Sequence, residues 1–144
     1  MSNWLLDTGP LVAYLDSGDP AHPEVAAALD AFSGQLFTTS AVITEAMHFL
    51  AASSNGPRLL SELAAAAGVQ VFDLSQPNAL REAAALMEKY ADTPMDYADA
   101  TLLLLAEQLG IVDILTLDRR GFSTYRTRQN KPLKQVLERL GGRA

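Results

Sequence analysis

Residues 4–10 read WLLDTGP, a short apolar run that ends at an acidic turn and is followed by a proline. Three consecutive apolar residues suit a short buried strand. Pro10 suits the first position of a helix, where its fixed backbone angle fits and its missing N–H would have no partner anyway. The stretch therefore predicts a strand, a turn that carries Asp7, and a helix.

The rest of the chain repeats this order of strand and helix. Glycines such as Gly34, Gly68 and Gly110 end segments of helical periodicity, and prolines open several of them. We expect strands at 4–6, 36–38, 69–72 and 112–117, and helices at 10–15, 23–32, 41–51, 57–67, 77–91 and 95–109. Strands separated by helices predict an α/β fold, with a mostly parallel sheet covered on both faces.

The composition limits the possible classes of protein. A chain of 144 residues, with 49% hydrophobic and 19% charged residues, can form one ordinary domain with its own core. It has no cysteine, which excludes disulfide scaffolds, thiolate zinc sites and cysteine nucleophiles. We also find no secretion signal and no apolar run long enough for a membrane span, so we expect a cytoplasmic protein without a membrane partner.

The charge is divided unevenly along the chain. A net charge of −6 argues at face value against a nucleic-acid partner, because phosphate binding usually requires a basic surface. However, residues 1–118 contain 16 acidic and three basic residues, whereas residues 119–144 contain eight basic residues and one acidic residue. This basic C-terminal segment, 119–144, is typical either of a patch that meets a polyanion or of a tail that only aids solubility.

Acidic residues recur where the predicted strands end and the following helices begin. Asp7 and Asp118 end the first and last predicted strands, and Glu45 interrupts an otherwise apolar helix. Asp96 and Asp99 are three residues apart in the first turns of a predicted helix, so both can face the same way. Singly, such acids are often turn or helix-capping residues. In a parallel sheet, however, all five positions fall on the edge where ligands bind.

A cluster of these carboxylates predicts a metal site. Two like charges 4 Å apart repel by about 4 kcal/mol at an effective dielectric constant near 20, so the cluster requires a cation or raised pKa values. An all-oxygen site suits Mg²⁺ or Mn²⁺, which pair naturally with phosphate substrates. The chemistry that follows is metal-assisted hydrolysis of a phosphodiester, in which one ion activates water and a second can stabilise the leaving oxygen.

Four segments together resemble the PIN domain, in its VapC-like subgroup. They read DTGPLVA at 7–13, TE at 44–45, MDYADA at 95–100 and LTLDRRGF at 115–122, and the resemblance extends from residue 3 to about residue 126. It implies a single PIN-like domain over residues 1–144, built as a three-layer α/β/α sandwich with a central mostly parallel sheet of four or five strands. It also implies a Mg²⁺- or Mn²⁺-dependent endoribonuclease that leaves 5′-phosphate and 3′-hydroxyl ends.

The resemblance also implies roles for particular residues. The family's acidic quartet, which binds metal and carries catalysis, is matched by Asp7, Glu45, Asp99 and Asp118. Asp96 matches an additional metal-binding acid of the subgroup, and Thr8 and Thr116 stand where small hydroxyl residues often hold metal-bound water. Relatives often carry a further acid where this chain has Gly121, so one or two ions are implied.

Partners follow from the same resemblance. Many VapC-like proteins are toxins inhibited by a small antitoxin, which lies in an apolar groove and extends a basic side chain into the acidic site. Two apolar helical faces could form that groove or a homodimer contact, or could simply be core: Val42, Met47, Phe49 and Leu50, and Leu59, Leu60 and Leu63. The alternatives are a housekeeping RNA-processing nuclease of the same family without an antitoxin, and a catalytically silent RNA-binding or interaction module.

Contacts to RNA are expected from the basic segment. Arg119 and Arg120 directly follow Asp118, and a guanidinium binds phosphate in a bidentate manner, although the pair could instead belong to a solvated turn. Arg126 and Arg128 extend the same positive charge. Three aromatic residues could either stack on bases or fill the core: Tyr97, Phe122 and Tyr125.

Overall fold

The computed structural model describes residues 2–141 and contains one five-stranded sheet. The strands are β1 (Asn3–Leu6), β2 (Gln35–Thr39), β3 (Gln70–Phe72), β4 (Asp113–Leu115) and β5 (Lys134–Gln135). Their spatial order is β3-β2-β1-β4-β5, and every neighbouring pair is parallel. The predicted parallel sheet is therefore confirmed, with five strands and with β1 at its centre.

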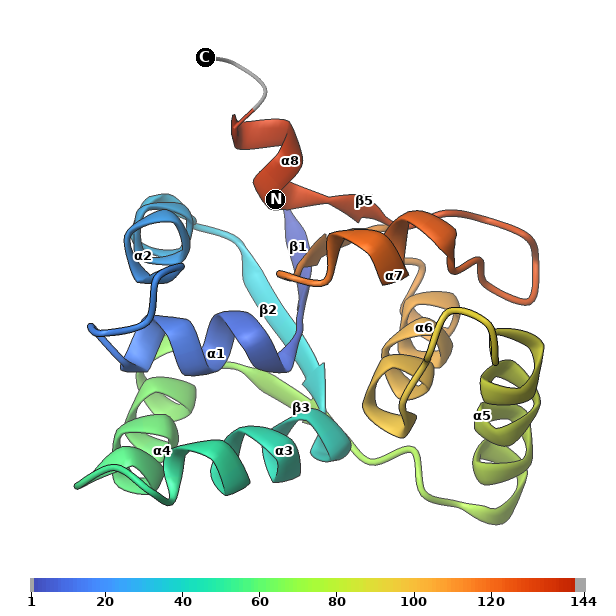
Figure 1. Ribbon diagram of the computed structural model, residues 1–144, viewed down its shortest axis with the longest axis horizontal. Coiled ribbons are helices and arrows are strands. Elements are labelled where there is room, and N and C mark those ends of the chain that lie inside the picture. The colour runs from blue at the N-terminus through green and yellow to red at the C-terminus, as the bar shows by residue number, and fades with distance from the viewer. Residues whose placement is uncertain (1, 142–144) are drawn as a thin grey trace.

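Helices connect the strands and cover the sheet. They are α1 (Thr8–Leu15), α2 (His22–Ala31), α3 (Ser40–Leu50), α4 (Gly56–Ala67), α5 (Pro77–Lys89), α6 (Tyr97–Leu109), α7 (Arg119–Thr124) and α8 (Val136–Gly141). Figure 1 shows α1, α2 and α4 on one side of the strands and α5 and α6 on the other, which is the layered α/β arrangement expected from the sequence. No helix within residues 2–141 has both the length and the apolar character needed to cross a lipid bilayer.

The core is centred on β1 and α6. Leu5 and Leu6 of the central strand are buried, and the Trp4 ring stacks on Phe32 at a centroid distance of 3.9 Å. Helix α6 is buried at every residue from Ala98 onward to Ala106, because it packs between the sheet and α5. A helix buried in this way carries its first-turn acid, Asp99, into a region with little water.

The chain beyond residue 117 contains more structure than the sequence predicts. Helices α7 and α8 and strand β5 all lie within the basic segment, of which residues 142–144 fall outside the described residues. Strand β5 pairs with β4 through the register Asp113 to Lys134, but it is only two residues long. An element of two residues shows no periodicity, which is why the sequence predicts only the four longer strands.

Candidate functional site

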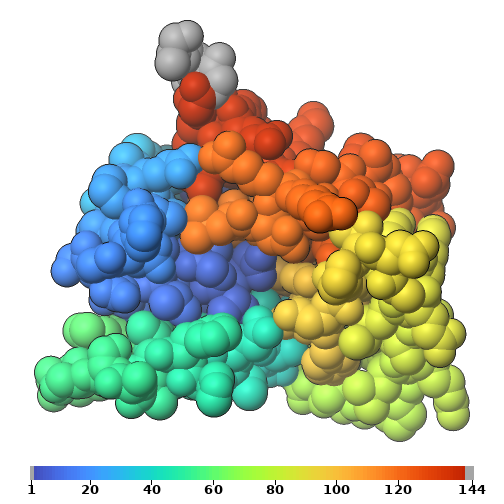
Figure 2. Space-filling view, in the orientation of Figure 1, coloured from blue at the N-terminus to red at the C-terminus, as the bar shows by residue number. Residues whose placement is uncertain are grey.

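The predicted acidic residues converge on one cleft of about 610 Å³ at the carboxyl-terminal edge of the sheet. Asp7 follows β1 and caps α1, Asp118 follows β4 and caps α7, and Asp96 caps α6. Figure 2 shows this face of the molecule, where α1 in dark blue is recessed between α3 in teal, α6 in gold and α7 in orange. The described lining residues are Asp7, Thr8, Gly9, Val12, Asp19, Glu45, Phe49, Pro94, Asp96, Asp99, Leu117 and Asp118.

Asp7 is the most enclosed acid of the cleft, with 7% of its surface exposed. One carboxylate oxygen accepts a hydrogen bond from the Thr8 N–H at 2.8 Å, and the other accepts one from the Thr116 hydroxyl at 2.7 Å. Burial raises the pKa of Asp7 to about 6, against the opposing effect of these two hydrogen bonds. The fold therefore holds a carboxylate where its charge is poorly solvated.

Asp99 is the second buried acid, with 8% of its surface exposed. Its backbone N–H donates to the Asp96 carboxylate at 2.8 Å, and its own carboxylate accepts from the Asp96 N–H at 3.2 Å. This reciprocal pair is a capping box, so both acids do cap α6, as their positions in the sequence allowed. Burial, followed by the charges of Asp7 and Asp96, raises the pKa of Asp99 to about 8.

Glu45 reaches the cleft from the second turn of α3. The Thr8 hydroxyl donates to its carboxylate at 2.6 Å, which links the helix after β2 to the helix after β1. Burial raises the pKa of Glu45, and the charge of Asp96 raises it further, while the Thr8 hydrogen bond opposes both. The prediction that this acid points into a partly buried site agrees with its place in the cleft lining.

Thr8 and Thr116 both contact acids in this structure. Besides donating to Asp7, the Thr116 hydroxyl oxygen accepts the Asp118 N–H at 3.0 Å, so one side chain connects two of the acid-bearing turns. Thr8 likewise follows Asp7 directly and bonds to Glu45. Their role in holding metal-bound water stays a prediction, but their hydroxyls already orient the carboxylates.

Gly121 has a local role that sequence reasoning missed. Its N–H donates to the Asp118 carboxylate at 3.0 Å, so the acid folds back over the start of α7. A Cβ at position 121 would lie 2.3 Å from the other Asp118 carboxylate oxygen and 2.9 Å from the Tyr125 ring. Any side chain here would displace Asp118, so the glycine that departs from the family pattern is required for this placement of the acid.

Tyr125 fixes the distance between two sides of the cleft. Its ring is buried edge-to-face against Tyr90 and Phe122, and its hydroxyl donates to the Pro94 carbonyl at 2.9 Å. The hydroxyl thereby ties the end of α7 to the segment that leads into Asp96. Of the two interpretations of Phe122 and Tyr125, core packing is the one that the structure supports.

The apolar helical faces divide between core and surface. Val42, Leu50 and Leu60 are buried in the core, whereas Leu59 is exposed. Phe49 is also exposed and lies in the lining of the acidic cleft. The apolar residue type alone does not distinguish the two environments.

The four predicted arginines do not line the cleft in the part of the chain that the structure describes. Arg119 forms an exposed ion pair with Glu24 of α2 at 3.3 Å. The Arg126 guanidinium donates to the carbonyls of residues 123–125 in its own turn. Within residues 2–141, the Arg120 guanidinium has no hydrogen bond or ion pair, so it is available to a ligand.

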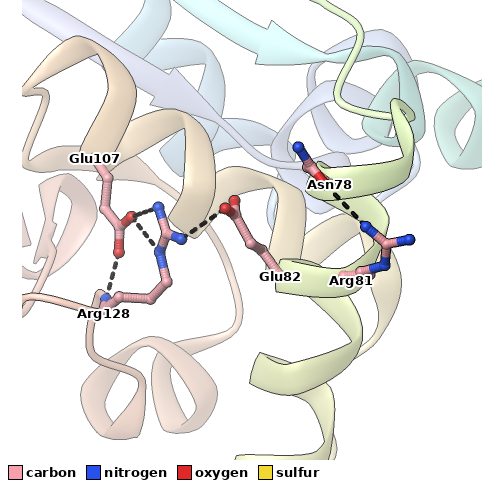
Figure 3. A network of polar contacts seen from close by, with 5 residues as sticks. All are labelled: Asn78, Arg81, Glu82, Glu107 and Arg128. Carbon is pink, nitrogen blue, oxygen red and sulfur yellow. Dashed lines mark hydrogen bonds and ion pairs between the residues drawn. The ribbon is translucent and has the colours of Figure 1, made fainter.

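Arg128 serves a structural purpose on the far side of α6. Figure 3 shows its guanidinium between Glu107 of α6 and Glu82 of α5, at 2.7 Å and 2.9 Å. Its backbone N–H also donates to Glu107, whose side chain is only 5% exposed. The basic charge at this position is therefore already neutralised by two acids, and nothing in its placement directs it toward the cleft.

The donor set fits a hard divalent cation in its chemistry. The described lining offers six carboxylates, the five predicted ones and that of Asp19, together with the Thr8 hydroxyl, and it contains no lysine or arginine. The Thr116 hydroxyl contacts Asp7 beside this lining. Within residues 2–141, no three of the acids lie close enough together, as placed, to hold one metal ion. Asp99 and Asp118 each accept a hydrogen bond from a backbone N–H. Burial, and to a smaller extent the neighbouring carboxylates, raise the pKa of Asp7 and of Asp99, and a cation bound beside them would oppose both effects.

Comparisons with known proteins agree with this geometry. The chain is 34% identical to Ribonuclease VapC26 of Mycobacterium tuberculosis over 128 residues. This match covers 85% of this chain and 91% of that protein. The crystal structure of VapC20 from the same organism, described as a Sarcin-Ricin loop cleaving toxin, matches with a TM-score of 0.75, 16% identity and coverage of 85% of this chain and 94% of VapC20.

A toxin-antitoxin complex from Klebsiella pneumoniae matches with a TM-score of 0.61 and 21% identity, over 84% of this chain and 91% of the matched chain. These structural likenesses are below 25% identity and support the fold. The family model of the PIN domain matches residues 4–127, nearly the range over which the sequence motifs show the resemblance. The chain therefore belongs to the PIN domain family.

Proposed function

We propose that this protein is a divalent-metal-dependent endoribonuclease, which hydrolyses RNA phosphodiester bonds at the acidic cleft. The observation that carries the proposal is the convergence of acids from four distant segments of the chain on that cleft. Helix capping accounts singly for Asp7, Asp96, Asp99 and Asp118, but it accounts neither for Glu45, in the second turn of α3, nor for the presence of all five acids in one cleft. The 34% identity to a protein named as a ribonuclease supports the same chemistry.

Asp7, Glu45, Asp99 and Asp118 would hold one or two Mg²⁺ or Mn²⁺ ions, with Asp96 as an additional ligand. When bound, such an ion lowers the pKa of water and stabilises the negative charge that develops on the phosphate and the leaving oxygen. The protein's own contribution is orientation: Thr116 fixes the Asp7 carboxylate, Thr8 fixes Glu45, and Gly121 fixes Asp118.

Arg119 and Arg120 are the arginines best placed to attract the RNA backbone, because both lie in the first turn of α7, directly after Asp118. Arg120 is available within the described residues, and the exposed pair of Arg119 with Glu24 is weak enough to exchange for a phosphate. Arg126 and Arg128 contribute through long-range attraction at most, since both guanidiniums are already bonded.

The deciding experiment is cleavage of RNA by the purified protein with Mg²⁺ or Mn²⁺, run beside EDTA and an Asp7→Asn variant. We expect cleavage that requires the metal and is lost in the variant, with 5′-phosphate ends on the products. Cleavage that survives both EDTA and Asp7→Asn would come from another site or a contaminant, and would contradict the proposal.

We further propose that the nuclease is the toxin of a toxin-antitoxin pair, acting on RNA in the cytoplasm as a homodimer. The named relatives include a toxin and a toxin-antitoxin complex. Expression without the antitoxin should arrest growth, and co-expression of a short reading frame next to its gene should restore it. Unharmed growth with active nuclease would instead indicate a housekeeping enzyme, and sedimentation of the purified protein tests the dimer.

A further inference from the structure

Phe49 is an exposed aromatic ring inside an acidic cleft. Its side chain is 60% exposed, although large apolar side chains of this kind are usually buried in a folded domain. It lies in the cleft lining together with Asp7, Glu45 and Asp96. A ring in this position adds little to the stability of the core, so its open face is available to a ligand of the cleft.

The position of Phe49 on α3 relates it directly to the acidic residues. It follows Glu45 by four residues, which places both side chains on one face of the helix, about 6 Å apart along its axis. His48 lies edge-on to the ring at a centroid distance of 5.7 Å and an interplanar angle of 61°. The cleft thus holds an exposed aromatic ring one helical turn from a carboxylate.

We propose that Phe49 stacks on one unpaired base of the RNA, next to the phosphate at the acidic cleft. This inference rests on the ribonuclease function proposed above and adds a subsite to it. A base fits the surroundings because it offers a flat face to the ring while its sugar and phosphate extend toward the acids and their cation. Base stacking on aromatic side chains also tolerates any sequence, since every base has such a face.

A protein partner fits this ring less well. Protein interfaces bury continuous apolar patches, whereas the apolar residues that share this lining, Val12, Pro94 and Leu117, lie among six acids. Glu45 itself lies one helical turn from Phe49. One exposed ring among these acids is sufficient for a base but small for a protein interface. The stacked base must leave its own helix, so double-stranded RNA should be cleaved poorly.

The kinetic test compares Phe49→Leu, which keeps an apolar side chain without the aromatic face, with Phe49→Trp, which keeps the face. On single-stranded RNA of mixed sequence with Mg²⁺, we expect Phe49→Leu to raise KM by a factor of about 5 to 150 at nearly unchanged kcat, and Phe49→Trp to keep the wild-type KM. An abasic nucleotide beside the mapped cleavage bond should raise KM for the wild type and have little further effect on Phe49→Leu.

A binding test does not depend on cleavage. In an Asp7→Asn background, the fluorescence of Phe49→Trp should be quenched by a short oligoadenylate but not by an abasic oligomer of the same length. The same background with Phe49 intact corrects for Trp4, the natural tryptophan.

The possible results separate the two proposals. An unchanged KM in Phe49→Leu, or quenching that is equal with the abasic oligomer, would overturn the stacking subsite. If Phe49→Leu changed the oligomeric state seen in sedimentation and left KM unchanged, Phe49 would belong to a protein contact, and the stacking subsite would also be overturned. A wild-type protein that cleaves no RNA would refute the nuclease proposal alone, because base-dependent quenching would still support the subsite.

Discussion

Replacing Asp7 by asparagine should stabilise the metal-free protein while abolishing its nuclease activity. The folded protein raises the pKa of Asp7 from 3.8 to about 6, chiefly by burial, so the folded state binds the proton more tightly than the unfolded chain does. The stability that this proton contributes is complete below pH 3.8 and is lost as the pH rises through 6. At pH 8 the ionised carboxylate therefore destabilises the fold, and a neutral amide avoids that cost.

The magnitude follows from the two pKa values and the hydrogen bonds. One pKa unit corresponds to about 1.4 kcal/mol, so a rise from 3.8 to about 6 amounts to about 3 kcal/mol at pH 8. The amide can accept from the Thr8 N–H but loses the hydrogen bond that the Thr116 hydroxyl donates to the carboxylate, which offsets about 1 kcal/mol. We expect a net gain of about 2 kcal/mol at pH 8, or about 6 °C in Tm.

The assay is urea unfolding in EDTA at pH 4, 6 and 8, followed by the fluorescence of the buried Trp4. The advantage of Asp7→Asn should be greatest at pH 8 and absent at pH 4, where the wild-type carboxyl is protonated. Asp92→Asn, the same chemical change at an exposed turn residue, should give a difference near zero. A variant less stable than the wild type at pH 8, or an advantage independent of pH, would refute the attribution to buried charge.

Three further changes test other contacts. Gly121→Ala should displace Asp118 and lower metal-dependent cleavage about tenfold or more, which corresponds to about 1.4 kcal/mol in the barrier. The far-UV circular dichroism spectrum should stay similar to that of the wild type. Full activity would show that the added methyl group is accommodated without moving the acid. Arg128→Ala should lower the free energy of unfolding by about 1 to 2 kcal/mol, because Glu107 loses its cation although Arg128 itself is half exposed, and RNA affinity should change little. Arg120→Ala should do the opposite, leaving unfolding in urea unchanged while reducing the salt slope of RNA binding by about 1; an unchanged slope would remove Arg120 from the RNA contacts.

The sequence predicts those parts of the fold and site that depend on regular patterns. Asp7 and Asp118 are found together because parallel strands end at one edge, and each directly follows an apolar run. Glu45 is recognisable because an acid interrupts an apolar helix. These inferences need only the strand order of a parallel α/β fold and the period of a helix.

Other features depend on contacts between distant side chains, which no local pattern records. Arg128 reads as part of a basic surface, yet Glu82 and Glu107 from two other helices neutralise it. Phe49 is apolar like its neighbour, the core residue Leu50, but it lies on the helical face of Glu45 and lines the cleft. In the sequence, Gly121 is recognised only as a position without the acid that relatives often carry. The structure shows that a side chain at this position would collide with the Asp118 carboxylate.

The hydrogen bond between Thr116 and Asp7 joins residues 109 positions apart, and this separation bears on how the protein is made. During synthesis, β1 leaves the ribosome first, whereas its partner β4 and the acid that follows it emerge only after every element from α1 to α6. Until then the nascent chain holds an incomplete set of acids. We expect an RNA-cleaving site assembled in this way to stay inactive up to that point of translation.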